Sequence, residues 1–360
     1  RGLTNIYSYV YGSDAFNNCP AVETITFLGE KPPYISNSIW SETNSSDSVS
    51  RFFNDTRTFK SLKTIYVPDD SYQAYVNAYG KALRTETRIK TINGGDFIIE
   101  NQVLISYVGN AEQVTIPEGI VKIGDYAFLN NNTVTSVEVP ESVIEIGKCA
   151  FEGCTVLASF EMPTQIESIG DSAFEGCTEL AGELQLPKTV SAIGNRAFYN
   201  CGKLTGSLIF SDSIEQIGED TFHGCSGLNG ELSLPKSLKK IGNQAFYNCS
   251  LLKGELALPE GLELIGNSAF SGCSNLKGSL KIPDSVTSIG SYAFYNCSGF
   301  DGTLVLSENL QAIYNNTFYG CSGLNGTLKI PNSVTSISER AFSGDKGFNE
   351  IIVGDGVQYI

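Results

Sequence analysis

The chain has 360 residues, a formal net charge of −15 and a sequence pI near 4.6. Phosphate groups are bound by an excess of lysine and arginine, so this charge argues against nucleic acid and against electrostatic docking on anionic lipid. No window approaches the ~20 apolar residues that span a bilayer, so no direct membrane insertion of this fragment is expected.

The first 95 residues are predicted to close one repeat block. Residues 1–30 contain the motif Ser-Asp-Ala-Phe-Asn-Asn-Cys at 13–19, which recurs later, and they end in a strand over 24–27. Residues 31–95 hold an irregular insertion rich in Ser, Asn and Asp, then a strand over 61–68 and an amphipathic helix over about 70–83. The helix is indicated by apolar spacing of i, i+3, i+4 and i+7 after an acidic N-cap, at Tyr72, Tyr75, Val76 and Tyr79.

Residues 96–360 are predicted to form a second array, which begins with a hairpin-like lead-in over 97–107 and contains about ten repeats. A phenylalanine recurs first every 23 and then every 24 residues, at Phe128, Phe151, Phe174, Phe198, Phe222, Phe246, Phe270, Phe294, Phe318 and Phe342. A cysteine follows three residues after most of them, at Cys154, Cys177, Cys201, Cys225, Cys249, Cys273, Cys297 and Cys321.

Each repeat is predicted to form one coil of a solenoid. In a representative unit, Leu232 and Leu234 alternate with polar residues as in a strand, which Pro235 ends because it has no N–H for a ladder. Ile241 points inward from a second extended segment, and Phe246 lies in a short helical or 3₁₀ turn. The Gly or Asn before each cysteine suits a left-handed backbone, and a Gly inserted ahead of the strand in the longer units suits a bulge.

One coil cannot bury these side chains alone, so like residues are expected to lie over like in neighbouring coils. The predicted fold class is a β-rich α/β repeat solenoid. It is a right-handed superhelix of leucine-rich repeats with a parallel strand ladder, short helical or 3₁₀ turns, and 23–24 residues per repeat.

The pattern Ile-Pro-x-x-Val-x-x-Ile-Gly-x-x-Ala-Phe-x-Asn-Cys at 282–297 resembles the BspA-type leucine-rich-repeat family, over about residues 96–360 and again at 13–19. The resemblance implies a cell-surface or secreted protein of host-associated bacteria, several of which are adhesins for host matrix proteins or other microbes. It carries no catalytic motif. The chain begins and ends inside repeat units, so we expect a fragment whose anchor lies elsewhere.

The cysteines first suggest disulfides or a metal, but their register argues for a column of buried thiols. One cysteine per coil gives no Cys-x-x-Cys pair for zinc. Cys149 lies outside the column, so a disulfide or a reactive thiol at this residue stays an alternative. His223, the only histidine, occupies a position that sister units fill with tyrosine, which argues against catalysis. We expect no enzyme, no metal and no cofactor.

Two rows of outward side chains are candidate binding surfaces. The aromatic row offers flat rings for sugar or protein, unless its members only pack on one another, and comprises Tyr199, His223, Tyr247, Tyr295 and Tyr319, with Ser271 interrupting. The strand row lies on the sheet face where repeat proteins commonly bind partners, unless it is a plain solvated face. Its candidate residues are Glu183, Ile209, Glu231, Glu255, Lys281, Val305 and Lys329.

These observations favour a non-enzymatic binding module that is secreted or lies on the cell surface. It would act as an adhesin or a protein-interaction scaffold. The expected partner is a protein of the host matrix or of a microbial surface. Two alternatives stay open, namely a carbohydrate-binding surface through the aromatic row and a passive stalk that displays another domain.

Overall fold

The computed structural model describes residues 96–360 and, before them, the short segments 5–7, 24–27, 34–36, 64–67, 74–75 and 88–91. The chain divides into two compact units. The first holds residues 1–100 and 104–110, and the second holds 101–103 and 111–360.

The described segments of residues 1–95 form two small parallel sheets. β1 (Asn5–Tyr7) pairs with β3 (Tyr34–Ser36), and β4 (Thr64–Val67) lies between β2 (Thr24–Thr26) and β5 (Arg88–Thr91). Strands are therefore present where the sequence predicts them near 24–27 and 61–68. Of the predicted helix over about 70–83, residues 74–75 are helical, and the rest lies outside the described residues, as does the motif at 13–19.

A tight hairpin precedes the array, as the sequence indicates. β6 (Phe97–Glu100) and β7 (Val103–Tyr107) are neighbours in one sheet and are joined by two residues only. Both of these residues have positive φ, 49° at Asn101 and 65° at Gln102. Such a backbone matches the twist of the flanking strands, which is why two-residue hairpins prefer it.

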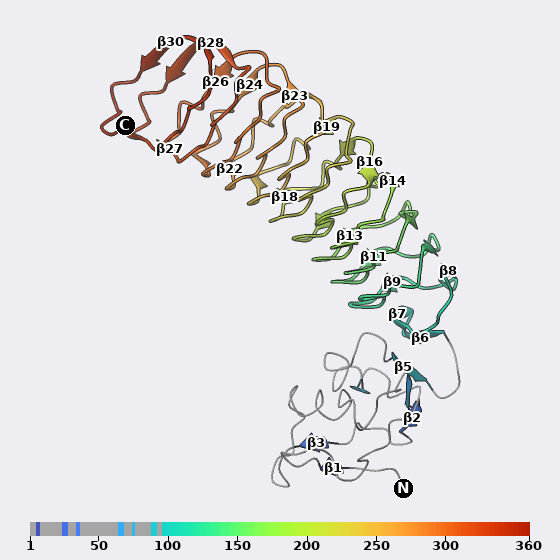
Figure 1. Cartoon of the computed structure of the whole chain (residues 1–360). Coiled ribbons are helices and arrows are strands. Elements are labelled where there is room, and N and C mark those ends of the chain that lie inside the picture. The colour runs from blue at the N-terminus through green and yellow to red at the C-terminus, as the bar shows by residue number, and fades with distance from the viewer. Residues whose placement is uncertain are drawn as a thin grey trace. The chain divides into compact units, whose positions relative to one another are not determined.

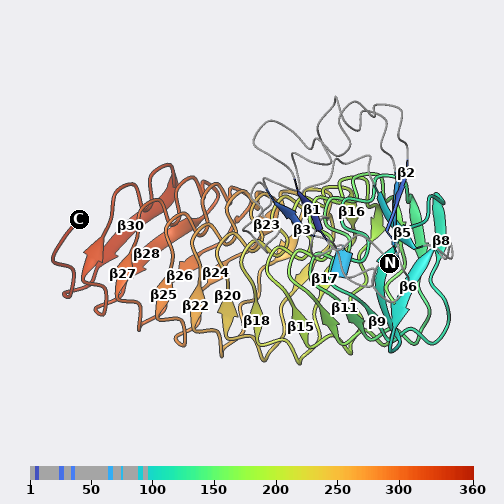
Figure 2. The same cartoon turned by 90° about the horizontal axis from the view of Figure 1, so that it is seen from below.

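The second unit is a solenoid of about eleven coils that stack side by side (Figures 1 and 2). One isoleucine per coil lies in a short parallel strand, and these strands, which form three successive sheets, are together called the isoleucine ladder. Its partners are in register, so that Ile217 pairs with Ile241 and Ile241 with Ile265. Its strands are β9 (Lys122–Ile123), β11 (Glu145–Ile146), β13 (Ser168–Ile169), β15 (Ala192–Ile193), β18 (Gln216–Ile217), β20 (Lys240–Ile241), β22 (Leu264–Ile265), β25 (Ser288–Ile289), β27 (Ala312–Ile313) and β29 (Ser336–Ile337).

A second set of parallel strands precedes the proline of most coils, or the residue in its place (Ser211, Ser307 or Gly354), and we call it the strand face. Inward leucines alternate with outward residues along it, as in the pairs Leu208↔Leu232 and Leu280↔Leu304. Its strands are β8 (Gln113–Thr115), β10 (Ser136–Glu138), β12 (Ser159–Phe160), β14 (Gly182–Glu183), β16 (Leu204–Thr205), β17 (Leu208–Ile209), β19 (Leu232–Ser233), β21 (Gly254–Glu255), β23 (Leu276–Lys277), β24 (Leu280–Lys281), β26 (Leu304–Val305), β28 (Asn325–Ile330) and β30 (Gly347–Val353).

The third side of each coil is a run of turns, where the sequence analysis expected a short helical or 3₁₀ segment. Along this run, backbone N–H groups donate alternately within the coil and to the next coil. Cys273 N–H donates to the Phe270 carbonyl of its own coil, and Phe270 N–H donates to the Ala293 carbonyl of the next one. The residue before each cysteine has positive φ, as predicted. A second left-handed position, two residues before each phenylalanine, was not foreseen and is non-glycine throughout, as at Ser268 with φ 53°. Because each run of turns contains two residues with a left-handed backbone, it cannot form a right-handed helix.

The core consists of columns of identical side chains. Successive ring centroids in the phenylalanine column lie 4.8 to 5.7 Å apart, with planes within 15° of parallel. Phe174, Phe198 and Phe222 are at most 1% exposed. Each column cysteine is a buried free thiol, and its Sγ donates to the phenylalanine carbonyl of the preceding coil, as Cys249 does to Phe222 at 3.1 Å. The predicted stack of like over like is confirmed.

We expect Gly242→Ala to destabilise the array by about 1–3 kcal/mol, because a Cβ there would lie 2.6 Å from the Gly218 carbonyl carbon of the preceding coil. The positions equivalent to Gly242 in two coils near the C-terminus are occupied by Tyr314 and Ser338, so a side chain is tolerated there. We therefore expect a loss of stability rather than complete unfolding. Gly261→Ala is the control, because its Cβ would meet only the mobile end of Lys239 within 3.9 Å. Equal shifts of the urea midpoint for the two variants would show that close backbone stacking does not require this glycine.

Candidate binding surfaces

All seven candidate residues of the strand face are exposed in the structure. The two aliphatic ones stand out, because Ile209 is 62% and Val305 48% exposed. Ile209 is paired with Ser233, so its side chain rises beside a small polar neighbour. A single exposed aliphatic residue is ordinary on a protein surface, so the surroundings of each decide its interest.

Val305 lies at the centre of a small patch with a charged rim. It pairs with Lys281 on one side, and the next strand, β28, carries Lys329. Both lysines are held by carboxylates of the preceding coil, since Lys281 Nζ lies 2.8 Å from Glu260 and Lys329 Nζ lies 2.9 Å from Glu308. The hydrogen bond to Glu260 raises the pKa of Lys281. An apolar centre inside a polar rim is the arrangement typical of protein-binding hot spots.

The aromatic row forms two stacks rather than one ridge. His223 lies between Tyr199 and Tyr247 with ring centroids 4.6 Å away on each side, and Tyr295 stacks on Tyr319 at 4.9 Å. All five rings are half-buried, while Ser271 between the two stacks is buried. The rings thus cover one another's faces. This packing favours the alternative that the row shields the edge of the coils.

A cluster of charges beneath this row was not found from the sequence. Arg196 donates to both carboxylate oxygens of Glu175, at 2.9 and 2.5 Å, and contacts Asp220 at 3.4 Å. Asp220 in turn lies 2.8 Å from Nδ1 of His223, and the guanidinium sits 3.9 Å from the ring centroid of Tyr199. The hydrogen bonds from Arg196 lower the pKa of Glu175 and those to Glu175 raise the pKa of Arg196.

This cluster fixes Tyr199 and His223 instead of offering them to a ligand. Asp220 is only 7% exposed, and its two oxygens are used by Arg196 and His223. The signal in the sequence that could have revealed this cluster is the presence of opposite charges in consecutive coils. The offset from Glu175 to Arg196 is 21 residues rather than 24, so the pair does not fall in one column and escapes a column-by-column comparison.

The thiols at the described positions are all buried. Burial raises the pKa of Cys154, Cys225 and Cys273 to about 12, which keeps them protonated. Cys149 is also a buried free thiol with a pKa raised by burial to about 12, so it is not a reactive thiolate. Among the residues that the structure describes, no group of three or more His, Cys, Asp or Glu side chains is arranged to hold a metal ion.

The part of the chain with described positions includes no helix that has the length and apolar character for crossing a bilayer.

Comparison with solved structures identifies bacterial leucine-rich-repeat proteins. A leucine-rich-repeat protein from Bacteroides ovatus is 26% identical with a TM-score of 0.52, covering 74% of this chain and 82% of that one. A leucine-rich cell surface protein from Faecalibacterium prausnitzii is 25% identical, covers 72% and 93%, and has a TM-score of 0.42. The pneumococcal vaccine antigen PcpA is 21% identical, covers 72% and 78%, and has a TM-score of 0.45. No curated protein matches the sequence.

Family membership rests on the repeats themselves. Residues 98–229, 191–298 and 241–360 match the model of the BspA type leucine rich repeat region, with six copies. Leucine-rich-repeat solenoids are typically non-enzymatic scaffolds that mediate protein–protein contact. Since the match extends over the whole second unit, the chain belongs to the BspA-type leucine-rich-repeat family.

Proposed function

We propose that this chain is a protein-binding module of a bacterial surface or secreted protein, and that it acts as an adhesin through its strand face. The observation that carries the proposal is the patch around Val305, an exposed aliphatic side chain between two lysines that are themselves tethered by Glu260 and Glu308. Tethered charges lose little freedom when a partner covers the patch, so binding there is less costly. The cell-surface description of the Faecalibacterium protein suggests the location.

The alternatives have less support. A sugar ring stacks on a free aromatic face, but most faces of the aromatic row are occupied by the neighbouring ring. A passive stalk needs no exposed aliphatic residues on its sheet. The patch in which Val305 lies between two tethered lysines therefore favours a binding surface over both alternatives.

The test uses surface plasmon resonance of the chain against purified collagens, fibronectin, fibrinogen and laminin. For a matrix protein that binds, we expect Val305→Asp to weaken the affinity at least about tenfold, because a buried hot-spot side chain contributes more than about 1 kcal/mol. Ala257→Asp adds the same charge to the same outward row and should change little, and Tyr247→Ala tests the aromatic row.

Two outcomes oppose the proposal. Binding that is lost in Tyr247→Ala and kept in Val305→Asp would move the site to the aromatic row. Failure of every matrix protein to bind this chain would remove the adhesin function from the strand face and favour the stalk.

A further inference from the structure

The repeat length changes from 23 to 24 residues at one place, and the strand face opens there. β12 is the last strand of a sheet with β10 and β8, whereas β14 pairs with β16. On this side of the coils, the last backbone hydrogen bond before the two strands runs from Ala181 N–H to the Ala158 carbonyl. No backbone hydrogen bond links residues 159–162 to β14. The two strands therefore diverge over the core.

The opening lies at Gly182, the first of the inserted glycines. The later ones all lie close to the preceding coil, as Gly206 lies against the side chain of Glu183 and Gly254 against that of Glu231. A Cβ on Gly182 would meet nothing within 4 Å, because the shorter coil before it has no bulge to fill that space. The array thus has a built-in mismatch between coils of two lengths.

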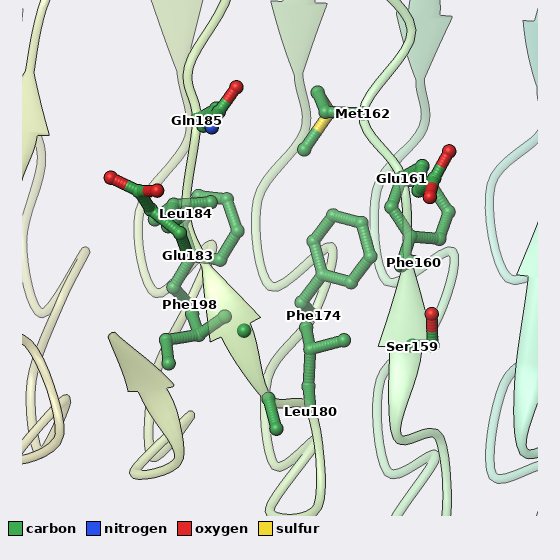
Figure 3. A pocket seen from close by; sticks show the side chains of 13 residues that line it. Ser159, Phe160, Glu161, Met162, Phe174, Leu180, Glu183, Leu184, Gln185 and Phe198 are labelled. Atoms are coloured by element: carbon green, nitrogen blue, oxygen red, sulfur yellow. The ribbon is translucent and has the colours of Figure 1, made fainter. Parts of the chain in front are cut away.

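The mismatch leaves a hollow of about 480 Å³, which lies within the range of ~300–1,000 Å³ usual for ligand sites. Figure 3 shows Phe160 and Met162 on one wall and Leu184 on the other, with Phe174 and Phe198 beneath. Phe160 and Met162 are half-buried and reachable, whereas the two deeper rings belong to the buried phenylalanine column. Phe160 is held in place by edge contacts with Phe151 and Phe174 at 5.2 and 4.9 Å.

The rim of the hollow is acidic. Glu161, which directly follows β12, and Glu183, the last residue of β14, lie on opposite sides of it (Figure 3). Both side chains are exposed, and within the described part of the chain neither makes an ion pair or a side-chain hydrogen bond. Glu231 and Glu255, at the positions equivalent to Glu183, are also exposed, so what sets Glu161 and Glu183 apart is that they line the hollow together. Two unpaired carboxylates over an apolar wall select a cation that carries apolar surface.

We propose that the hollow between β12 and β14 binds a short extended segment of a protein partner in which a lysine or arginine is flanked by aliphatic side chains. The basic group lies between the carboxylates of Glu161 and Glu183, and the aliphatic side chains contact Phe160, Met162 and Leu184. The unpaired edge of β12 offers backbone groups to such a segment, as in recognition by strand addition. This site is separate from the patch around Val305 and does not depend on it.

Met162 makes the proposal directly testable, because it is the only methionine of the chain. In the protein labelled with ¹³C at the methionine methyl group, Met162→Leu identifies its resonance. Titration with the blocked peptide Gly-Val-Lys-Val-Gly should shift this resonance saturably, and the peptide Gly-Val-Glu-Val-Gly should not. The double variant Glu161→Gln, Glu183→Gln should weaken binding about fivefold to tenfold, since each exposed ion pair contributes at most about 1 kcal/mol.

The matched control is Glu231→Gln, which removes a carboxylate from the position equivalent to Glu183 where the coils are of equal length. It should leave the titration unchanged. The proposal is overturned if the Met162 resonance does not move, if the lysine and glutamate peptides shift it equally, or if the double variant binds as tightly as the original protein. Val305→Asp should have no effect, so this site and the strand-face proposal can fail independently.

Discussion

Replacing Phe246 with alanine is expected to lower the free energy of unfolding by about 3–5 kcal/mol, the cost of truncating a buried aromatic side chain. Phe246 is fully buried and stacks on Phe222 at 5.7 Å and Phe270 at 5.2 Å. The cavity would lie between two coils whose backbones are held together by hydrogen bonds, such as Phe246 N–H to the Ala269 carbonyl. The neighbouring rings therefore cannot move together to fill it.

Tyr247→Ala is the control, since it removes a ring of similar size one residue away. Tyr247 is half-buried and contacts His223 on one face, so we expect a loss of only about 1 kcal/mol. Urea denaturation followed by far-UV circular dichroism measures both changes. Losses of equal size would show that the division of the coil into inward and outward positions is wrong.

The periodicity predicts most of the solenoid, because stacked coils force equivalent residues into equivalent environments. Phe246 and Cys249 are buried, and Glu231 is exposed, as their register indicates. The left-handed residue before each cysteine was also predictable, since glycine and asparagine tolerate that backbone. Domain boundaries and the identity of the binding residues remain proposals, since register shows which side chains are outward and not what contacts them.

Features that break the register were not predictable in the same way. Arg196 reaches Glu175 across coils with an offset of 21 residues, which depends on side-chain direction and not on column position. The left-handed backbone at Ser268 and its equivalents follows from bonds between coils, which override the mild preference of non-glycine residues against that conformation. The hollow at Gly182 lies where coils of 23 and 24 residues meet. The change in repeat length is visible in the sequence, but the separation of the strands that accompanies it is not.

The last cysteine position of the column is occupied by Asp345, and this residue should make the C-terminal coil more stable at low pH. Burial raises the pKa of Asp345 to about 7, and both carboxylate oxygens are buried without a hydrogen-bond partner. Each cysteine of the column donates to a phenylalanine carbonyl, as Cys321 does to Phe294 at 3.0 Å. A protonated carboxyl group can donate in the same way, whereas a carboxylate cannot.

The pKa of Asp345 is higher in the folded than in the unfolded chain. The stability that its protonated carboxyl group contributes is therefore fully present below about pH 4 and is lost as the pH rises toward 7. Allowing for solvent screening at this partly exposed site, we expect the coil to lose roughly 1–2 kcal/mol between pH 5 and pH 8. Amide hydrogen exchange over residues 341–353, expressed as protection factors, measures this change in the coil itself.

Asp345→Asn should remove the pH dependence, and Asp345→Cys should in addition restore the thiol bond of the column and raise protection at pH 8. Asp355→Asn changes an exposed carboxylate of the same coil and should leave the pH profile as it was. If the profile of Asp345→Asn matched that of the original protein, the carboxyl group of Asp345 would not be the group that titrates. The column would then tolerate a carboxylate where all its other coils from Cys154 onward place a thiol.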